Sequence, residues 1–293
     1  MKIAIVGFGE VGRIFFEDLS DSHEIVAWDI AFSIPGSPAS TNAVLTGVTT
    51  ATSASEAVTH ADFVVSAVTA ANTLAVAEAV APGLEKDALF FDLNSAAPGH
   101  KQEAADVIHA AGGRYIEAAL MSPIGPRRLN SPFMLGGPHA QEFATAHCGK
   151  ESDLKLDSAV VVSDKIGVAA ATKLCRSVIV KGLESLFGES LLAARHYGVE
   201  KEVIESLNNI LPEADWEPIA SYFISRSLQH GTRRSEEMFE AARTVSEAGY
   251  EPRMASAAAE HEAWAAQFKS AFNPDNLTAM LDGINTAARK SDS

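Results

Sequence analysis

The chain has 293 residues, a length that predicts two domains or one large one. Its 23 Lys and Arg against 38 Asp and Glu give a net charge of −15, which disfavours nucleic acids and anionic membranes as partners because both need a basic surface. Two cysteines, Cys148 and Cys175, are too few for a disulfide framework, and no histidine has metal-ligand spacing with a second ligand, so no metal is expected.

The amino-terminal run is too short for a signal peptide, because the apolar stretch Met1 to Val6 reaches Gly7 within a few positions. Nowhere does the chain hold about eighteen uninterrupted apolar residues, the length that a membrane-spanning helix requires. We therefore expect a cytoplasmic protein.

Short apolar runs alternate with helical segments over the first half of the chain. Runs that are apolar throughout are typical of strands buried on both faces of a parallel sheet. The expected strands are 2–6, 24–28, 63–68, 89–93, 114–118, 131–135 and 159–162. The pattern predicts an α/β fold: a Rossmann-type, doubly wound parallel sheet.

After Gly167 the pattern changes to long amphipathic helices, which predicts an all-α C-terminal domain. We place the domains at 1–165 and 166–293, with a small, polar, frayed tail after about residue 285. The expected helices are 168–197, 200–210, 216–229, 232–248 and 252–271, separated by Gly198, Pro212, Gly231 and Gly249.

A glycine motif with the spacing G-x-G-x-x-G directly follows the first strand and opens a helix. Its first glycine permits a tight turn, its second lets backbone amides approach a pyrophosphate, and its third lets the helix pack closely on the sheet. The helix N-terminus adds amide donors and a partial positive charge. The expected cofactor-binding residues here are Gly7, Phe8, Gly9, Glu10, Val11 and Gly12.

Asp29 ends the second strand, at the place where an acidic side chain accepts hydrogen bonds from an adenosine ribose. The same carboxylate repels a 2′-phosphate, and no Lys or Arg lies between Asp29 and Lys86 to pair with one. We therefore expect NAD rather than NADP as the cofactor.

Two later strand ends meet the same edge of the predicted sheet, where ligands of doubly wound sheets bind. Val68 and Thr69 follow one strand, and Asn94 and Ser95 follow another. Their small polar side chains suit the ribose or nicotinamide, and they suit a plain turn equally well.

Lys173 lies in an apolar, Ala-rich segment early in the longest predicted helix. Such a position is unusual for lysine, although the side chain can also reach solvent along the helix surface. A lysine that removes a proton near neutral pH must be neutral part of the time, which desolvation and the neighbouring Arg176 favour.

The whole arrangement resembles the β-hydroxyacid dehydrogenase family, which includes 3-hydroxyisobutyrate and 6-phosphogluconate dehydrogenases. The family motif Gly-x-Gly-x-x-x-Lys-x-x-x-Asn matches Gly167 and Lys173, with Ala169 in place of the second glycine and Ser177 in place of Asn. The family's Asp-x-Ser-Thr segment resembles Asp92 to Ser95. The resemblance implies that Lys173 is the catalytic base and that Ser177 contacts substrate.

The substrate segment of the family, Asp-Ala-Pro-Val-Ser-Gly-Gly, is altered in this chain, which reads Glu-Ala-Ala-Leu-Met-Ser-Pro-Ile-Gly from residue 117. Ser122 stands one position late and Pro123 replaces the first glycine, so fewer backbone amides can hold a substrate carboxylate. Arg127 and its neighbour Arg128 are candidate clamps for an anion, or ordinary surface arginines. His230 is a candidate substrate contact from the helical domain, or a solvated helix start.

These residues predict an NAD-dependent dehydrogenase that oxidises a hydroxyl-bearing small molecule, such as a 3-hydroxy acid. The alternatives are an imine reductase, a decarboxylating dehydrogenase on the same fold, and a non-catalytic NAD-binding protein. The apolar surface of the helix at 168–197, together with the resemblance, predicts a homodimer.

Overall fold

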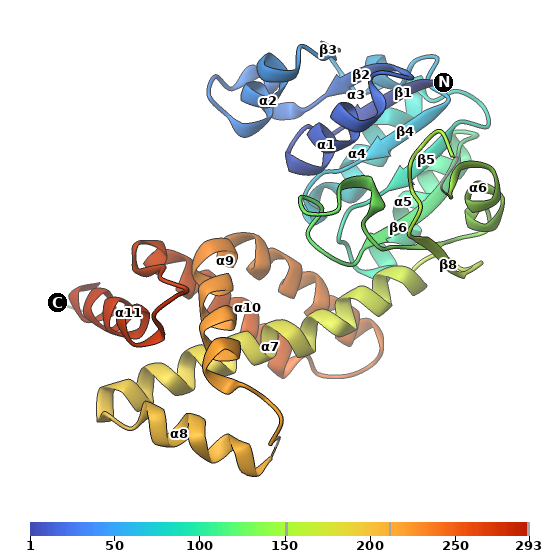
Figure 1. Cartoon of the computed structure of the whole chain (residues 1–293). Coiled ribbons are helices and arrows are strands. Elements are labelled where there is room, and N and C mark those ends of the chain that lie inside the picture. Colours follow the sequence, from blue (N-terminus) through green and yellow to red (C-terminus); the bar gives the residue numbers. More distant parts are fainter. Residues whose placement is uncertain (150–151, 211, 292–293) are drawn as a thin grey trace. The chain divides into compact units, whose positions relative to one another are not determined.

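The computed structural model describes residues 1–149, 152–210 and 212–291 (Figure 1). The chain forms two compact units, Met1–Lys173 and Leu174–Ser293. The division falls inside a long helix, later than the boundary expected after residue 165.

The first unit is built on an eight-stranded sheet with the order β3-β2-β1-β4-β5-β6-β7-β8. Its strands are β1 (Lys2–Val6), β2 (Glu24–Trp28), β3 (Thr49–Thr50), β4 (Phe63–Ser66), β5 (Leu89–Asp92), β6 (Arg114–Leu120), β7 (Phe133–Gly136) and β8 (Ala159–Ser163). The predicted α/β fold is confirmed. The two-residue edge strand β3 is additional, because its exposed threonines carry no apolar signal.

Two strands depart from the predicted parallel arrangement, because β7 runs antiparallel to β6 and β8 runs parallel to β7. Parallel neighbours need a crossover connection that usually contains a helix. The segment between these two strands holds only the single 3₁₀ turn Arg128–Asn130. The chain therefore returns beside β6 in the opposite direction.

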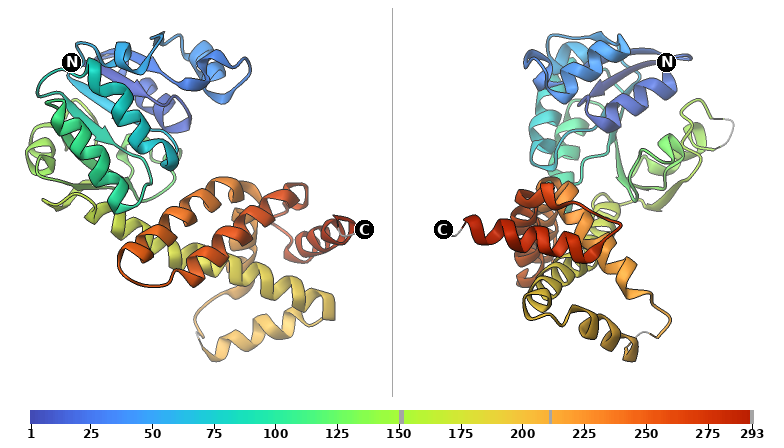
Figure 2. Two further views of the ribbon diagram at one scale, coloured as in Figure 1. Left: turned by 180° about the vertical axis from the view of Figure 1, so that it is seen from behind. Right: turned by 60° about the vertical axis from the view of Figure 1, so that its left-hand side comes forward.

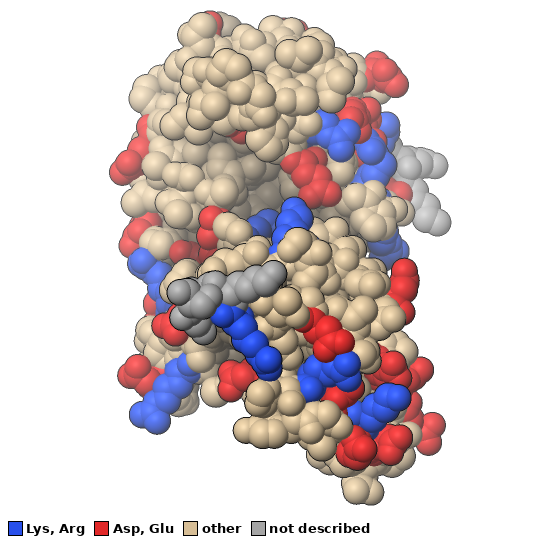
Figure 3. All heavy atoms as spheres, turned by 90° about the vertical axis from the view of Figure 1, so that its left-hand side faces the viewer, with Lys and Arg blue, Asp and Glu red and all other residues tan. Residues whose placement is uncertain are grey.

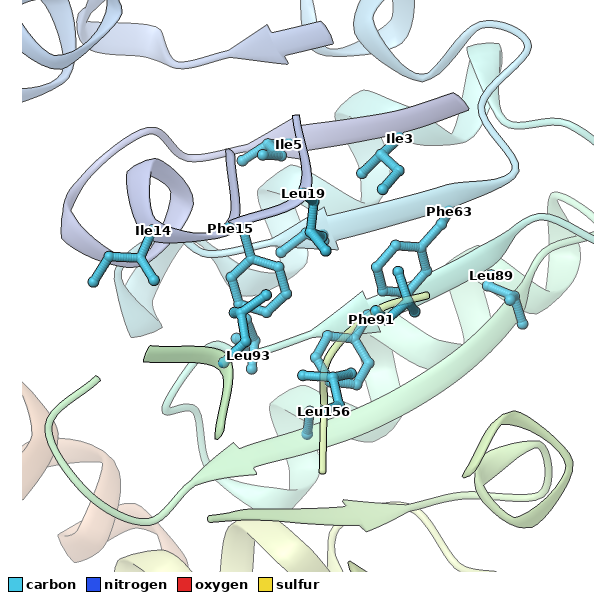
Figure 4. Packing of buried hydrophobic residues seen from close by; sticks show 14 of the residues in the cluster. Ile3, Ile5, Ile14, Phe15, Leu19, Phe63, Leu89, Phe91, Leu93 and Leu156 are labelled. Carbon is cyan, nitrogen blue, oxygen red and sulfur yellow. The ribbon is translucent and has the colours of Figure 1, made fainter. Parts of the chain in front are cut away.

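Apolar side chains alternate between the two faces of the sheet and build a core on each. Ile3 and Ile5 face one core, whereas Ala4 and Val6 face the other. On the first face, Phe15 and Leu19 from helix α1 meet Phe63 and Phe91 from the strands (Figure 4). Helices α1 (Glu10–Leu19) and α6 (Ala140–His147) contribute to the first core, and α4 (Thr73–Val80) and α5 (Pro98–Ala110) to the second.

Two short helices complete the described part of this unit, α2 (Pro38–Thr46) and α3 (Ala54–Val58). Ser37 and Ser53 start them, since each side chain accepts a backbone N–H from the first turn of its helix. The stretch from Ile30 to Ser55 contains no charged residue. In the upper part of Figure 3, the surface that faces the viewer is mostly tan, with acidic side chains along its margins.

The second unit is helical (Figure 2). Its long helices pack around two small cores. Its helices are α7 (Val168–Tyr197, which starts in the first unit), α8 (Glu200–Ser206), α9 (Trp216–Glu247), α10 (Arg253–Ala265) and α11 (Leu277–Ser291). The predicted all-α domain is confirmed. Within the described ranges, no helix combines the length and the apolar character that crossing a membrane demands.

Two sequence expectations are wrong in this unit. Gly231 does not end a helix but lies inside the continuous α9, where an added Cβ would stand 2.3 Å from the backbone oxygen of Glu262. It is therefore a point of close packing between α9 and α10. The segment expected to be a frayed tail after about residue 285 is helical up to Ser291 and forms the end of α11, whose amphipathic pattern outweighs its small residues. Residues 292 and 293 of that tail lie outside the described part.

Candidate active site

The three glycines of the β1–α1 turn have different surroundings. Gly7 has a φ of +95°, and an added Cβ would lie 2.4 Å from the backbone oxygen of Ala67. At Gly12 the added atom would lie 2.1 Å from the backbone oxygen of Gly7. Gly9, in contrast, has nothing within 4 Å of such an atom. Gly7 and Gly12 are thus required by packing, and Gly9 keeps a space open.

This open space lies at the N-terminus of α1, whose first-turn amides have no acceptor within the helix. Glu10 and Val11 provide those amides, and Glu10 is exposed. A pyrophosphate needs a cradle of this kind, with donors and no Cβ in the way. The turn therefore fits the dinucleotide that the sequence motif implies.

Asp29 fixes the edge of the same cradle. Its Oδ2 accepts the backbone N–H of Phe8 at 2.7 Å, and its Oδ1 accepts that of Ala31 at 2.8 Å. A carboxylate offers about four acceptor positions, so two remain for ribose hydroxyls. Asp29 both ties β2 to the glycine turn and keeps the capacity to bind a ribose.

The ends of β4 and β5 are joined by Asn94, which is buried. Its Oδ1 accepts the backbone N–H of Val68 at 2.7 Å, and its Nδ2 donates to the Ser66 hydroxyl at 2.9 Å. Thr69 is exposed beside this link, and its hydroxyl accepts a hydrogen bond from Asn72. Asn94 thus shapes the loop that presents Val68 and Thr69; direct cofactor contact by these three residues stays a prediction.

Lys173 reaches the end of β5, where its Nζ donates a hydrogen bond to the Ser95 hydroxyl. Both side chains are half-buried. The sequence assigned these two residues separately, and the structure brings them together at the carboxyl edge of the sheet. An amine and a hydroxyl so placed can bind an oxygen of a small molecule and exchange a proton with it.

A buried polar network underlies this pair. Asp92 accepts hydrogen bonds from Tyr115 and from the backbone N–H of Asn94, and it forms an ion pair with Lys101 at 3.1 Å. Glu117 lies beside Asp92 on the neighbouring strand. Burial, together with the Asp92 carboxylate, raises the pKa of Tyr115 well above its ordinary value.

Sequence reasoning missed Lys101, Tyr115 and Glu117 as parts of the site. A signal existed, since Glu117 is a carboxylate followed and preceded by apolar residues of a strand, and ionisable residues are rarely buried without partners. The partners themselves come from three different elements, so no local pattern connects them.

The loop after β6 carries Ser122, Pro123 and Arg127. Gly125 of this loop lies beside Glu10 at the start of α1, since an added Cβ would stand 3.5 Å from its Oε1. Ser122 is half-buried, whereas Pro123 and Arg127 are exposed. Arg128 is committed elsewhere, to ion pairs with Glu17 and Asp18 of α1 at 2.9 and 2.8 Å.

In the helical unit, Ser177 is buried and its hydroxyl accepts a hydrogen bond from Lys181 at 3.1 Å. Lys181 also forms an ion pair with Glu237 of α9 at 2.7 Å. Burial lowers the pKa of Lys181, which Glu237 opposes. His230 lies half-buried on α9. The substrate roles of Ser177 and His230 stay predictions.

The fold and the glycine turn define a dinucleotide-binding protein of the Rossmann class. Residues 2–146 match the model of the NAD binding domain of 6-phosphogluconate dehydrogenase, and residues 194–264 match a domain of unknown function (DUF1932). With these two domains, the chain belongs to the β-hydroxyacid dehydrogenase family.

Three relatives illustrate the similarity. A conserved hypothetical protein from Sinorhizobium meliloti is 30% identical, with a TM-score of 0.72 over 98% of this chain and 96% of the other. The 3-hydroxyisobutyrate dehydrogenase of Mycobacterium tuberculosis, solved with L-serine, is 18% identical, with a TM-score of 0.70 over 96% and 98% of the two chains, and shows the shared fold.

The mitochondrial 3-hydroxyisobutyrate dehydrogenase of Drosophila melanogaster is 25% identical over 212 residues. That match takes in 71% of this chain and 63% of the fly protein, so it spans less than two thirds of the relative's length.

Proposed function

We propose that the protein is an NAD-dependent dehydrogenase acting on the hydroxyl group of a small acid, with Lys173 as its general acid and base. The observation that carries this proposal is the contact between Lys173 and Ser95 at the carboxyl edge of the sheet that also holds the glycine turn. Oxidation of a CH–OH group needs a hydride acceptor and a proton acceptor. The family supplies the first as NAD, and the amine of Lys173 serves as the second.

In the oxidative direction, the substrate C–H bond breaks and its electron pair leaves as hydride. The glycine turn and Asp29 would hold a nicotinamide dinucleotide, which would supply the acceptor for this hydride. The hydroxyl proton passes to Nζ of Lys173, and the C–O single bond becomes a carbonyl. Ser95 holds the amine in place and donates its own hydrogen bond to the reacting oxygen. In the reverse direction Lys173 returns the proton.

A 3-hydroxy acid is the substrate class that the relatives support, because the fly relative is a 3-hydroxyisobutyrate dehydrogenase and the mycobacterial structure holds L-serine, which also carries a 3-hydroxyl and a carboxylate. The segment from Ala118 to Gln141 favours an anionic substrate, since Arg127 and Arg128 are its only Asp, Glu, Lys or Arg residues. Because Arg128 pairs with acidic residues of α1, we assign the substrate carboxylate to Arg127 and Ser122.

NAD is favoured over NADP by the surroundings of Asp29. The next residue, Ile30, is apolar and 77% exposed, so it offers no charge to a 2′-phosphate. The stretch from Ala31 to Glu85 contains no Lys or Arg.

The test is replacement of Lys173 by Met, which keeps the length of the side chain and removes the amine. We expect turnover of a 3-hydroxy acid panel to fall by about a hundredfold or more, with NAD affinity unchanged in calorimetric titration. Lys165→Met is the matched control, because Lys165 is exposed in the same unit. Turnover by Lys173→Met at the control's rate would refute the assignment.

A further inference from the structure

The start of α7 is fixed by a carboxylate that comes from the sheet. Glu117 of β6 is fully buried; its Oε2 accepts the backbone N–H of Gly167 and its Oε1 that of Ala170, both at 2.7 Å. Gly167 directly precedes α7 and Ala170 lies in its first turn, where backbone amides have no acceptor within the helix. Lys173 stands on the next turn of the same helix.

The space for this carboxylate is provided by a glycine on the neighbouring strand. Gly136 of β7 lies opposite Glu117 in the antiparallel register, and a Cβ there would stand 2.6 Å from Oε2 of Glu117. The position of the carboxylate is therefore determined from two sides, by the helix amides and by the missing side chain of Gly136.

A second contact holds the same helix start against the loop that carries Ser95. Gly167 has a φ of +94°, and an added Cβ would lie 3.0 Å from the Cβ of Pro98. Pro98 begins α5, three residues after Ser95. Both partners of the Lys173–Ser95 hydrogen bond are thus anchored at the point where Glu117 binds α7.

We infer that Glu117 is a positioning residue for Lys173: by binding the amides of Gly167 and Ala170, its carboxylate sets the start of α7 and holds the lysine amine against Ser95. This role rests on the proposed function of Lys173 in proton transfer. Glu117 itself does not contact the reacting atoms.

The role requires a carboxylate, because both of its oxygens accept an N–H and a helix N-terminus favours negative charge. Burial raises the pKa of Glu117 and the Asp92 carboxylate raises it further, while Lys101 and the two amides lower it. Asp92, Lys101 and Tyr115 are the ionisable groups of this network. Lys101, which is 2% exposed, supplies the positive charge that keeps two neighbouring buried carboxylates together.

The test uses two variants that break the same contact in different ways. Glu117→Gln keeps the shape but turns an NH₂ group toward a backbone N–H, and Gly136→Ala displaces the carboxylate without changing it. Gly182→Ala is the control: it lies on α7, and an added Cβ meets nothing within 4 Å.

The first readout is the rate at which Lys173 reacts with acetic anhydride, followed by mass spectrometry. In both variants the hydrogen bonds from Gly167 and Ala170 to the Glu117 carboxylate are weakened, so the amine of Lys173 is no longer held against Ser95. We expect its labelling rate to rise about tenfold, the change that corresponds to loss of one hydrogen bond to a charged acceptor. Lys165 should react at the wild-type rate in every protein. Where the variants are also assayed for turnover, kcat should fall while NAD affinity stays at the wild-type value, a split that general destabilisation does not produce.

The second readout uses the wild-type protein, so it does not depend on a variant that folds. Amide hydrogen exchange at Gly167 and Ala170 should be as slow as in the interior of α7, although first-turn amides ordinarily exchange fast. Fast exchange at these two amides, or wild-type labelling of Lys173 in the variants, would overturn the inference. Neither readout needs turnover, so an inactive wild-type protein would refute the proposed function and leave this test standing.

Discussion

At the scale of single residues, the glycine turn contains two kinds of glycine that the motif does not distinguish. Gly12 is required because the backbone of Gly7 occupies the place of its side chain, whereas Gly9 borders open space. The first is a condition for folding and the second a condition for binding a pyrophosphate. Substitution by alanine separates the two.

We predict that Gly12→Ala lowers the free energy of unfolding by roughly 1–3 kcal/mol or more, because the added methyl overlaps the Gly7 carbonyl. Gly9→Ala should unfold at the wild-type temperature and yet bind NAD at least about tenfold more weakly, since its methyl enters the cradle. Thermal unfolding and calorimetric titration of both variants measure this. Equal loss of stability in the two would contradict the distinction.

For Asp29, we predict that replacement by Asn weakens NAD binding and raises the affinity for NADP relative to NAD. The amide still accepts one of the two backbone N–H groups, but the negative charge that repels a 2′-phosphate is gone. Titration of both cofactors against the wild type and the variant gives the ratio. Asp21→Asn, an exposed site, is the control. Tighter binding of NADP than NAD by the wild type would reject the assignment of Asp29.

The sequence predicts those site residues that lie in local motifs, and it misses those joined across strands. The glycines and Asp29 follow from spacing along the chain, and Lys173 follows from its apolar surroundings and the family resemblance. The pairing of Asp92 with Glu117 depends on the register of β5 and β6, and Lys101 reaches it from α5. No periodicity along one segment contains that information.

At the scale of elements, the predictions succeed where the residues of one segment are sufficient to determine its secondary structure. The strands buried on both faces and helix α7 were found close to their observed ends, because their apolar patterns are strong. The sequence predicts two helices separated at Gly231, because a glycine ordinarily weakens a helix; the structure has the single helix α9. Here close packing on α10 outweighs that preference, which only the tertiary structure shows.

The packing of α10 on α7 places His261 close to Gly188, where an added Cβ would lie 2.7 Å from Nε2. Burial lowers the pKa of His261, and the charge of Glu189 acts in the opposite direction. His261 therefore binds a proton less readily in the folded state than in the unfolded state, where histidine has its ordinary pKa of about 6.5. Protons favour the unfolded state below that pH, so stability falls as pH decreases.

We predict that Tm decreases between pH 7 and pH 5.5 and that His261→Gln makes this decrease smaller. Part of the dependence of Tm on pH should remain in this variant, because burial also lowers the pKa of His139. Glu117 and Glu262, whose pKa values burial raises, act in the opposite direction, because the folded state binds their protons first. Thermal unfolding across this range measures the difference between variant and wild type. Identical slopes would show that His261 does not contribute.

At the scale of the whole molecule, the net charge of −15 is unevenly distributed along the chain. The segments assigned to ligand binding are spared from acidic residues: 30–55 carries no charge, and 165–183 carries four basic residues and no acid. Two anionic ligands, a dinucleotide and a hydroxy acid, are therefore compatible with an acidic protein. The acidic residues lie in other segments of the chain, where their negative charge disfavours the binding of nucleic acid.

The remaining whole-molecule prediction concerns assembly. Ile179, Leu183 and Leu186 lie at i, i+4 and i+7 on α7 and are 66%, 40% and 52% exposed. An exposed apolar stripe on a long helix marks an interaction surface, and we expect a second copy of the chain to cover it.

Light scattering should therefore give about twice the chain mass of 30.9 kDa. Leu186→Glu should reduce it to one chain, because a carboxylate in the apolar interface cannot be buried without a partner. Val44→Glu, at an equally apolar site on α2 that is 84% exposed, should leave the dimer intact. A wild-type protein that scatters as a single chain, or a Leu186→Glu variant that remains dimeric, would place the interface elsewhere or remove it.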